Sequence, residues 1–67
     1  MNAANLEKSD RLKRVADLLK SGRPYSTMEI IHKAQVCAVN SIVAELRENG
    51  FDIVCNRLGN VWMYRMQ

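Results

Sequence analysis

The amino-acid sequence predicts an α+β domain in which three helices precede a two-stranded β-hairpin. Two apolar stripes at helical spacing, within residues 12–19 and 39–46, predict the first and third helices. A capping box between the stripes predicts the start of the second helix. Two strand-like segments that flank Gly59-Asn60 predict the hairpin.

The N-terminal residues 1–8 have no sustained period and are interpreted as a flexible arm before a single domain at 9–67. The first helix is predicted over 10–21, because apolar residues recur there every three or four positions. Gly22 can supply the left-handed residue that ends this helix, and Pro24 prevents the helix from resuming.

The second helix, predicted over 26–34, has the most specific local signal in the chain. Ser26 is followed three residues later by Glu29, which is the spacing of a capping box. Tyr25 before the cap and Ile30 four residues after it have the spacing of a hydrophobic staple. These two patterns together predict where the helix begins.

A four-residue turn at 34–37 leads to the third helix, predicted over 37–49. Residues 51–58 and 61–66 are rich in β-branched, aromatic and sulfur-containing side chains, and Gly59-Asn60 between them suits a two-residue hairpin turn. The expected cross-strand pairs are Leu58 with Val61, Arg57 with Trp62, Cys55 with Tyr64 and Ile53 with Met66.

The predicted core combines one stripe from each helix with the inner face of the hairpin. It consists of Leu12, Val15, Leu19, Ile30, Val39, Ile42 or Val43, Leu46, Phe51, Ile53 and Tyr64. A domain of 67 residues buries only about 60% of its unfolded surface. Dimerisation is a natural remedy for so small a core, and a homodimer is therefore among the expected partners.

Several classes of protein are not expected from this sequence. No apolar run approaches the ~20 residues that span a bilayer, and the N-terminus lacks the apolar segment of a signal peptide. A cytoplasmic protein with no membrane partner is expected. Cys37 and Cys55 fit no C-x-x-C pattern, so both thiols are expected to be free, and with His32 they lack a fourth metal ligand. No nucleophile–base pair or phosphate loop is present, so neither an enzyme nor a cofactor is expected.

The net charge of +3 is unevenly distributed. Residues 1–33 contain seven Lys/Arg and four Asp/Glu, whereas residues 34–67 contain three of each. A strong DNA binder usually gathers Lys and Arg on the face that meets the phosphates. The charge pattern therefore supports nucleic-acid binding only weakly.

The order of helix, helix, turn, helix and hairpin is that of a winged helix-turn-helix, which places its third helix in the major groove of double-stranded DNA. The third helix is expected to present Ala38, Asn40 and Ser41, of which Asn40 can pair with adenine and Ser41 can reach a base or a phosphate. The other expected contacts come from the start of the second helix, from nearby cations and from the hairpin tip: Ser26, Thr27, Lys33, Arg47, Arg57, Asn60 and Trp62. Bound to DNA, the protein would be associated with the nucleoid.

Arg57 and Trp62 face each other near the predicted hairpin tip, and two interpretations of this pair stay open. The pair is either a cross-strand cation–π contact, worth ~0.5–1 kcal/mol when exposed, or a tip that contacts DNA or another protein. The neutral second half of the chain and the apolar candidates Trp62, Val61 and Met63 support an alternative function. In this alternative the domain is an interaction module that binds and modulates a host protein.

Three motifs resemble those of small helix-turn-helix domains of phages and mobile elements. They are LLKSGRP at 18–24 followed by STME at 26–29, AELRENGFDI at 44–53, and YRM at 64–66. The resemblance covers residues 10–66 and implies a winged helix-turn-helix that binds DNA as a small regulator. The family carries Thr-Arg and a further Arg early in the third helix, where this chain has Cys37-Ala38 and Ile42. The third helix therefore lacks the common Arg–guanine contact.

Overall fold

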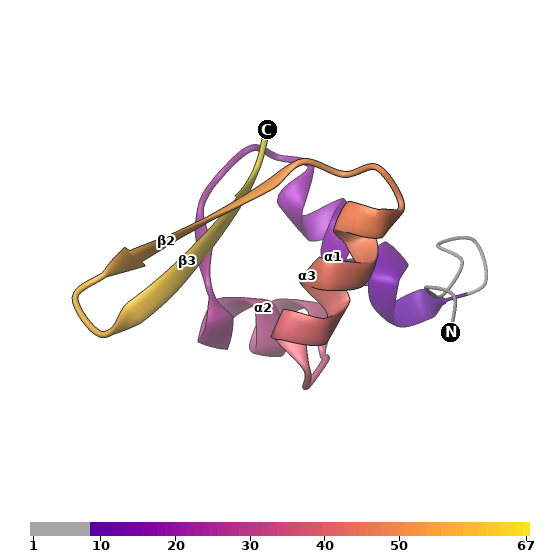
Figure 1. Ribbon diagram of the computed structural model, residues 1–67. Helices are drawn as coiled ribbons and strands as arrows, with labels where there is room; N and C mark the ends of the chain where they lie inside the picture. The colour runs from indigo at the N-terminus through magenta and orange to yellow at the C-terminus, as the bar shows by residue number, and fades with distance from the viewer. Residues whose placement is uncertain (1–8) are drawn as a thin grey trace.

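The computed structural model describes residues 9–67, which form three helices and a three-stranded antiparallel sheet (Figure 1). The elements along the chain are α1 (Asp10–Leu19), β1 (Tyr25–Ser26), α2 (Thr27–Ala34), α3 (Val39–Glu48), β2 (Ile53–Leu58) and β3 (Val61–Met66). The predicted α+β class is confirmed. The predicted N-terminal arm lies outside the described residues.

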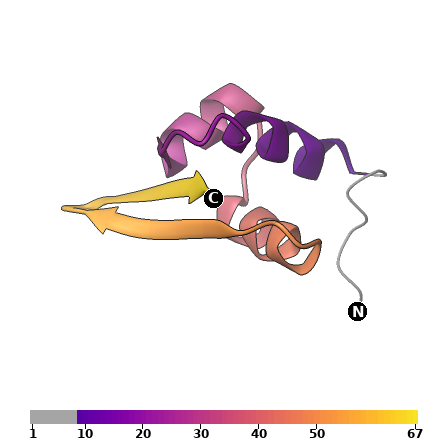
Figure 2. The same cartoon turned by 90° about the horizontal axis from the view of Figure 1, so that it is seen from above.

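The helices lie at one end of the molecule, and the β2–β3 hairpin extends away from them. Viewed from above, α1 and α2 lie on one side of the hairpin, and α3 lies at its base, in line with β2 (Figure 2). The chain passes directly from α3 into β2, so the hairpin begins beside this helix (Figure 1). The hairpin tip is thus free of helical cover.

The sheet has three strands, so the prediction of a two-stranded sheet is wrong. The strand order is β1-β3-β2, with Tyr25 opposite Tyr64 and Ser26 opposite Met63 on the additional edge. Ser26 is the N-cap of α2 and has an extended backbone, with φ −74° and ψ 164°. Because a cap residue and the residue before it are extended, they can pair with a neighbouring strand as well as begin a helix.

The predicted hairpin register is confirmed at every pair. Arg57 lies opposite Trp62, Cys55 opposite Tyr64, and Leu58 opposite Val61 beside the two-residue turn. Gly59 has φ +62° in this turn, a left-handed conformation that favours glycine.

The second helix begins as the capping box predicts. Ser26 Oγ accepts a hydrogen bond from the Glu29 amide at 3.1 Å, and Glu29 Oε1 accepts one from the Ser26 amide at 2.9 Å. Gln35, with φ 55°, ends α2 in the left-handed region. The third helix begins at Val39 instead of residue 37, and its N-cap, Ala38, makes no side-chain hydrogen bond to the free amides.

The core is formed by one face of each helix and by the inner face of the sheet. Its buried side chains are those of Leu12, Val15, Ala16, Leu19, Ile30, Ala34, Val36, Val39, Ile42, Val43, Leu46, Ile53 and Tyr64. Phe51, predicted in the core, is only half-buried and packs against it. The Phe51 amide donates to the Leu46 carbonyl at 3.1 Å, which holds this residue beside the end of α3. Among residues 9–67, no helix has the length and apolar character needed to cross a membrane.

Leu46→Ala should lower the free energy of unfolding by about 2–5 kcal/mol, because Leu46 is completely buried and its truncation leaves a cavity. Leu58→Ala is the matched control, since Leu58 is 65% exposed and should lose almost nothing. Thermal unfolding followed by circular dichroism measures both variants. Equal melting temperatures for the two variants would contradict the core described above.

Candidate functional site

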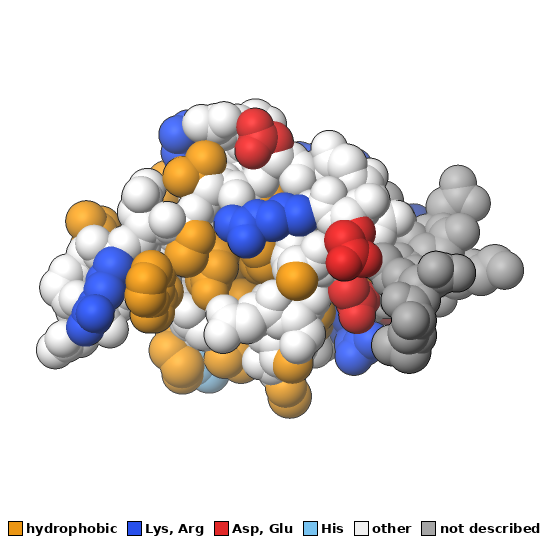
Figure 3. Space-filling view, in the orientation of Figure 1, with side chains coloured by type: hydrophobic (Ala, Val, Ile, Leu, Met, Phe, Trp, Pro, Cys, Tyr) orange, Lys and Arg blue, Asp and Glu red, His pale blue; other side chains and the backbone are white. Residues whose placement is uncertain are grey.

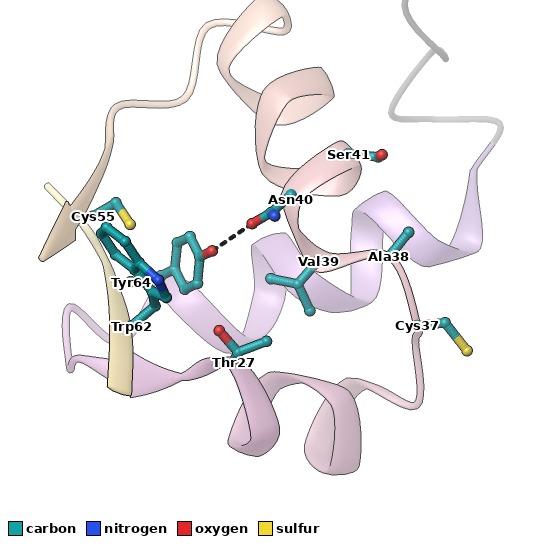
Figure 4. A pocket seen from close by; sticks show the side chains of 9 residues that line it. All are labelled: Thr27, Cys37, Ala38, Val39, Asn40, Ser41, Cys55, Trp62 and Tyr64. Carbon is teal, nitrogen blue, oxygen red and sulfur yellow. Dashed lines mark hydrogen bonds between the residues drawn. The ribbon is translucent and has the colours of Figure 1, made fainter. Parts of the chain in front are cut away.

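An open hollow of about 680 Å³ lies between α3, the start of α2 and the inner face of the hairpin (Figure 4). Its lining residues are Thr27, Cys37, Ala38, Val39, Asn40, Ser41, Cys55, Trp62 and Tyr64. The fold thereby brings together five predicted contact residues: Thr27, Ala38, Asn40, Ser41 and Trp62. The hollow is the candidate site because it combines the exposed start of α3 with the hairpin.

A side-chain hydrogen bond crosses the hollow from β3 to α3. The Tyr64 hydroxyl donates to Asn40 Oδ1 at 2.7 Å, as the dashed line in Figure 4 marks. Burial raises the pKa of the Tyr64 hydroxyl above its usual value of 10.0, so this group stays protonated and can donate at neutral pH. Asn40, for which the sequence predicted a base contact, therefore already accepts one hydrogen bond within the fold.

The other α3 residues of the site point elsewhere. In Figure 4, Asn40 points toward the hairpin, whereas Cys37, Ala38 and Ser41 point away from it. These three residues are exposed, so they form the outer rim of the hollow. The beginning of α3 therefore presents one polar side chain toward the hairpin and a second polar side chain, Ser41, on its outer side.

The hairpin contributes an arginine that is held on an exposed aromatic ring. The guanidinium carbon of Arg57 lies 5.8 Å from the centroid of the Trp62 ring, which confirms the predicted cation–π contact. Arg57 Nε also donates to the Gly59 carbonyl at 2.9 Å. Trp62 is 49% exposed on the side that faces the hollow. Within residues 9–67 the Nη atoms of Arg57 have no hydrogen-bond partner, so they remain available to a ligand.

Arg47 was predicted to contact phosphate, but its guanidinium is used within the fold. Its Nε and Nη2 donate to the Ile53 carbonyl at 3.1 and 2.7 Å. These bonds join the last turn of α3 to the first residue of β2. Arg47 therefore positions the hairpin relative to α3.

Three more of the predicted contact residues do not line the hollow. The Ser26 hydroxyl and amide both form the hydrogen bonds of the capping box. Lys33 is exposed in the last turn of α2, and Asn60 is exposed in the hairpin turn. Both remain accessible to a ligand.

Sequence reasoning missed two features of the site. Tyr64 and Cys55 were assigned to the core alone, although both also line the hollow. The alternation of side chains along β3 could have indicated that Tyr64 lines the hollow, since Trp62 and Tyr64 are two residues apart and share one face of the strand. Outside the site, Arg14 of α1 donates through Nε to the Ala34 carbonyl at 2.8 Å and caps the end of α2.

Apolar side chains gather on the face that carries the hollow, between the hairpin and α3 (Figure 3). Lys or Arg side chains lie on two sides of this area, and acidic side chains lie on the far side of α3 from the hairpin (Figure 3). The part of the chain that the structure describes has no group of three side chains able to hold a metal ion. Cys37 is exposed and Cys55 is half-buried, and both are free thiols.

Comparisons with known proteins identify no family for this chain. No protein-family model matches the chain, and neither a curated protein nor a solved structure matches it. The hollow, the exposed start of α3 and the hairpin tip are the observations from which a function can be inferred.

Arg47→Gln should lower the free energy of unfolding by about 1–2 kcal/mol, because both hydrogen bonds to the Ile53 carbonyl are lost. Arg65→Gln is the control, since Arg65 is an exposed arginine of β3 with no hydrogen bond from its side chain among residues 9–67. Urea denaturation measures the midpoint of each variant. If both variants unfolded at the same urea concentration, the structural role of Arg47 would be wrong.

Proposed function

We propose that this domain is a winged helix-turn-helix that binds double-stranded DNA, with α3 in the major groove and the β2–β3 hairpin as the wing. The observation that carries the proposal is that the exposed start of α3 and the hairpin border one hollow. A rod-shaped ligand that enters the hollow can contact both elements at once. The major groove is about 12 Å wide and admits an α-helix, and recognition helices contact base edges through their N-terminal residues.

The start of α3 supplies the proposed contacts to bases. Ala38, Asn40 and Ser41 lie within its N-cap and first turn, and all three side chains are exposed. Asn40 and Ser41 can form hydrogen bonds to base edges, and the small Ala38 allows close approach or contacts a thymine methyl group.

The hairpin and α2 supply the proposed contacts to the phosphate backbone. Arg57 is fixed by Trp62 and by the Gly59 carbonyl, so it loses less side-chain freedom when it binds a phosphate. Lys33, Asn60 and the start of α2 at Thr27 are the further proposed donors. Because these groups are few, affinity should depend only moderately on salt. The resemblance to phage and mobile-element domains supports a role as a small regulator.

A second function is supported by exposed apolar side chains. Leu58 and Val61 are 65% and 46% exposed and pair with each other on the outer side of the hairpin, opposite to Trp62. Met28 is also 59% exposed, whereas Met63, which the sequence suggested for such a surface, is half-buried. Exposed apolar side chains that lie together are typical of protein-binding surfaces. An interaction module that binds a host protein is therefore the alternative proposal.

Fluorescence anisotropy with pooled random duplexes, measured at increasing NaCl concentrations, tests DNA binding. About two or three phosphate contacts should give a slope of log affinity against log salt of roughly −2 to −3. Arg57→Ala should weaken all duplexes alike and reduce the slope by about one. Arg65→Ala is the matched control, because Arg65 pairs with Val54 on the face of the hairpin that points away from the hollow.

Absence of binding to any duplex at low salt would show that the DNA proposal is wrong. The interaction-module proposal would then be supported if Leu58→Ser abolished capture of a specific protein from a cell extract while Arg57→Ala, on the opposite face of the hairpin, retained it. Salt-dependent DNA binding that is weakened, with a smaller salt slope, in Arg57→Ala and unchanged in Arg65→Ala would instead support the DNA proposal.

A further inference from the structure

We infer that Tyr64 determines base specificity by fixing the side-chain amide of Asn40 as a hydrogen-bond donor toward DNA. This inference rests on the proposed function, because it concerns which bases the same site prefers. Tyr64 acts here as a positioning residue, since its hydroxyl contacts Asn40 and does not need to touch the DNA.

The position of the Tyr64 hydroxyl is fixed by the sheet. Tyr64 lies on the central strand, with Tyr25 opposite it on one side and Cys55 on the other. Its side chain is only 5% exposed, so the ring is held by the core, while its hydroxyl reaches Asn40 Oδ1 on α3 at 2.7 Å. A rigid donor at this place selects one orientation of an otherwise exposed amide.

An asparagine amide has an acceptor oxygen, Oδ1, with two lone pairs, and a donor nitrogen, Nδ2, with two hydrogens. Pairing with adenine uses both atoms side by side, because Nδ2 donates to N7 while Oδ1 accepts from the N6 amino group. In this structure the Tyr64 hydroxyl bonds Oδ1 and holds this oxygen turned toward the hairpin, so the Nδ2 hydrogens are the groups that the amide presents to the ligand. The sequence-based expectation was an adenine contact, which requires both atoms to face the base.

Nδ2 then contacts the base as a donor, without Oδ1 beside it as an acceptor. This favours bases that present acceptors in the major groove. Guanine presents O6 and N7, and thymine presents O4, whereas adenine places a donor amino group beside its N7. We therefore expect Asn40 to prefer guanine or thymine to adenine at the base pair that it contacts. This contact would recognise the same guanine edge that arginine most often recognises in protein–DNA complexes.

The test compares base preferences of the full chain and its variants with single-position duplex libraries. Asn40→Ala identifies the base pair, because discrimination should be lost there and kept at other positions. Tyr64→Phe keeps the buried ring but frees the amide, so adenine at that base pair should gain roughly fivefold or more relative to guanine. Tyr25→Phe is the matched control: it removes a hydroxyl that lies 3.4 Å from Ser21 Oγ and is not bonded to α3, so the preference should not change.

Asn40→Asp provides a second variant with an independent expectation. Its carboxylate keeps an oxygen for the Tyr64 hydroxyl but replaces the Nδ2 donor by an acceptor. The preferred base should therefore change from guanine or thymine to cytosine, whose N4 amino group is a donor. In the free protein, the Asn40 Nδ2 resonances should shift in Tyr64→Phe and not in Tyr25→Phe.

The outcomes separate this inference from the proposed function. If the parent protein binds no duplex, the proposed function is wrong, and the inference is wrong as well because it rests on that function. If the parent binds DNA but Tyr64→Phe retains the parent's preference at the Asn40 base pair, only the inference is overturned. A gain for adenine in Tyr64→Phe, with Tyr25→Phe unchanged, supports both.

Discussion

Strand β3 has a hydrogen-bonded strand on each side, and Tyr64 is one of the two residues, with Met63, that are paired on both sides. Strand β1 leads directly into α2, and β2 follows α3 after a short connection. One central strand therefore fixes both the start of α2 and the base of the hairpin. The same Tyr64 side chain packs in the core and bonds Asn40, so the core and the hollow depend on one constraint.

The parts of the fold that the sequence predicted are those decided by near neighbours in the chain. The capping box joins residues three apart, and the hairpin register follows from a two-residue turn with glycine at positive φ. Strand β1 was not predicted, because two residues cannot show a period and Ser26 already had a role as a helix cap. The pairing of β1 with β3 is decided by the tertiary fold, which brings together residues almost forty positions apart.

The site was predictable in composition and less so in its contacts. The segment order suggested that the start of α3 and Trp62 belong to one site, and the hollow contains both. The partners of the polar groups were not predictable, because the sequence shows which side chains can donate but not which carbonyls lie within reach. Arg47 was assigned to a ligand for this reason, although the Ile53 carbonyl occupies it. The bond from Tyr64 to Asn40 was not predicted, because the two residues are 24 positions apart.

Under the proposed function, side chains that are ordered before binding give a physical reason why a domain with few cations could bind a nucleic acid. Arg57 is held by an indole ring and a carbonyl, and Asn40 is held by a buried tyrosine. Side chains that are ordered before binding lose less entropy in the complex, so each contact contributes more to affinity. The same order restricts each contact to fewer ligands, since a fixed donor cannot become an acceptor. Under the proposed function, the ordering of these side chains should therefore raise selectivity between DNA sequences more than it raises overall affinity for DNA.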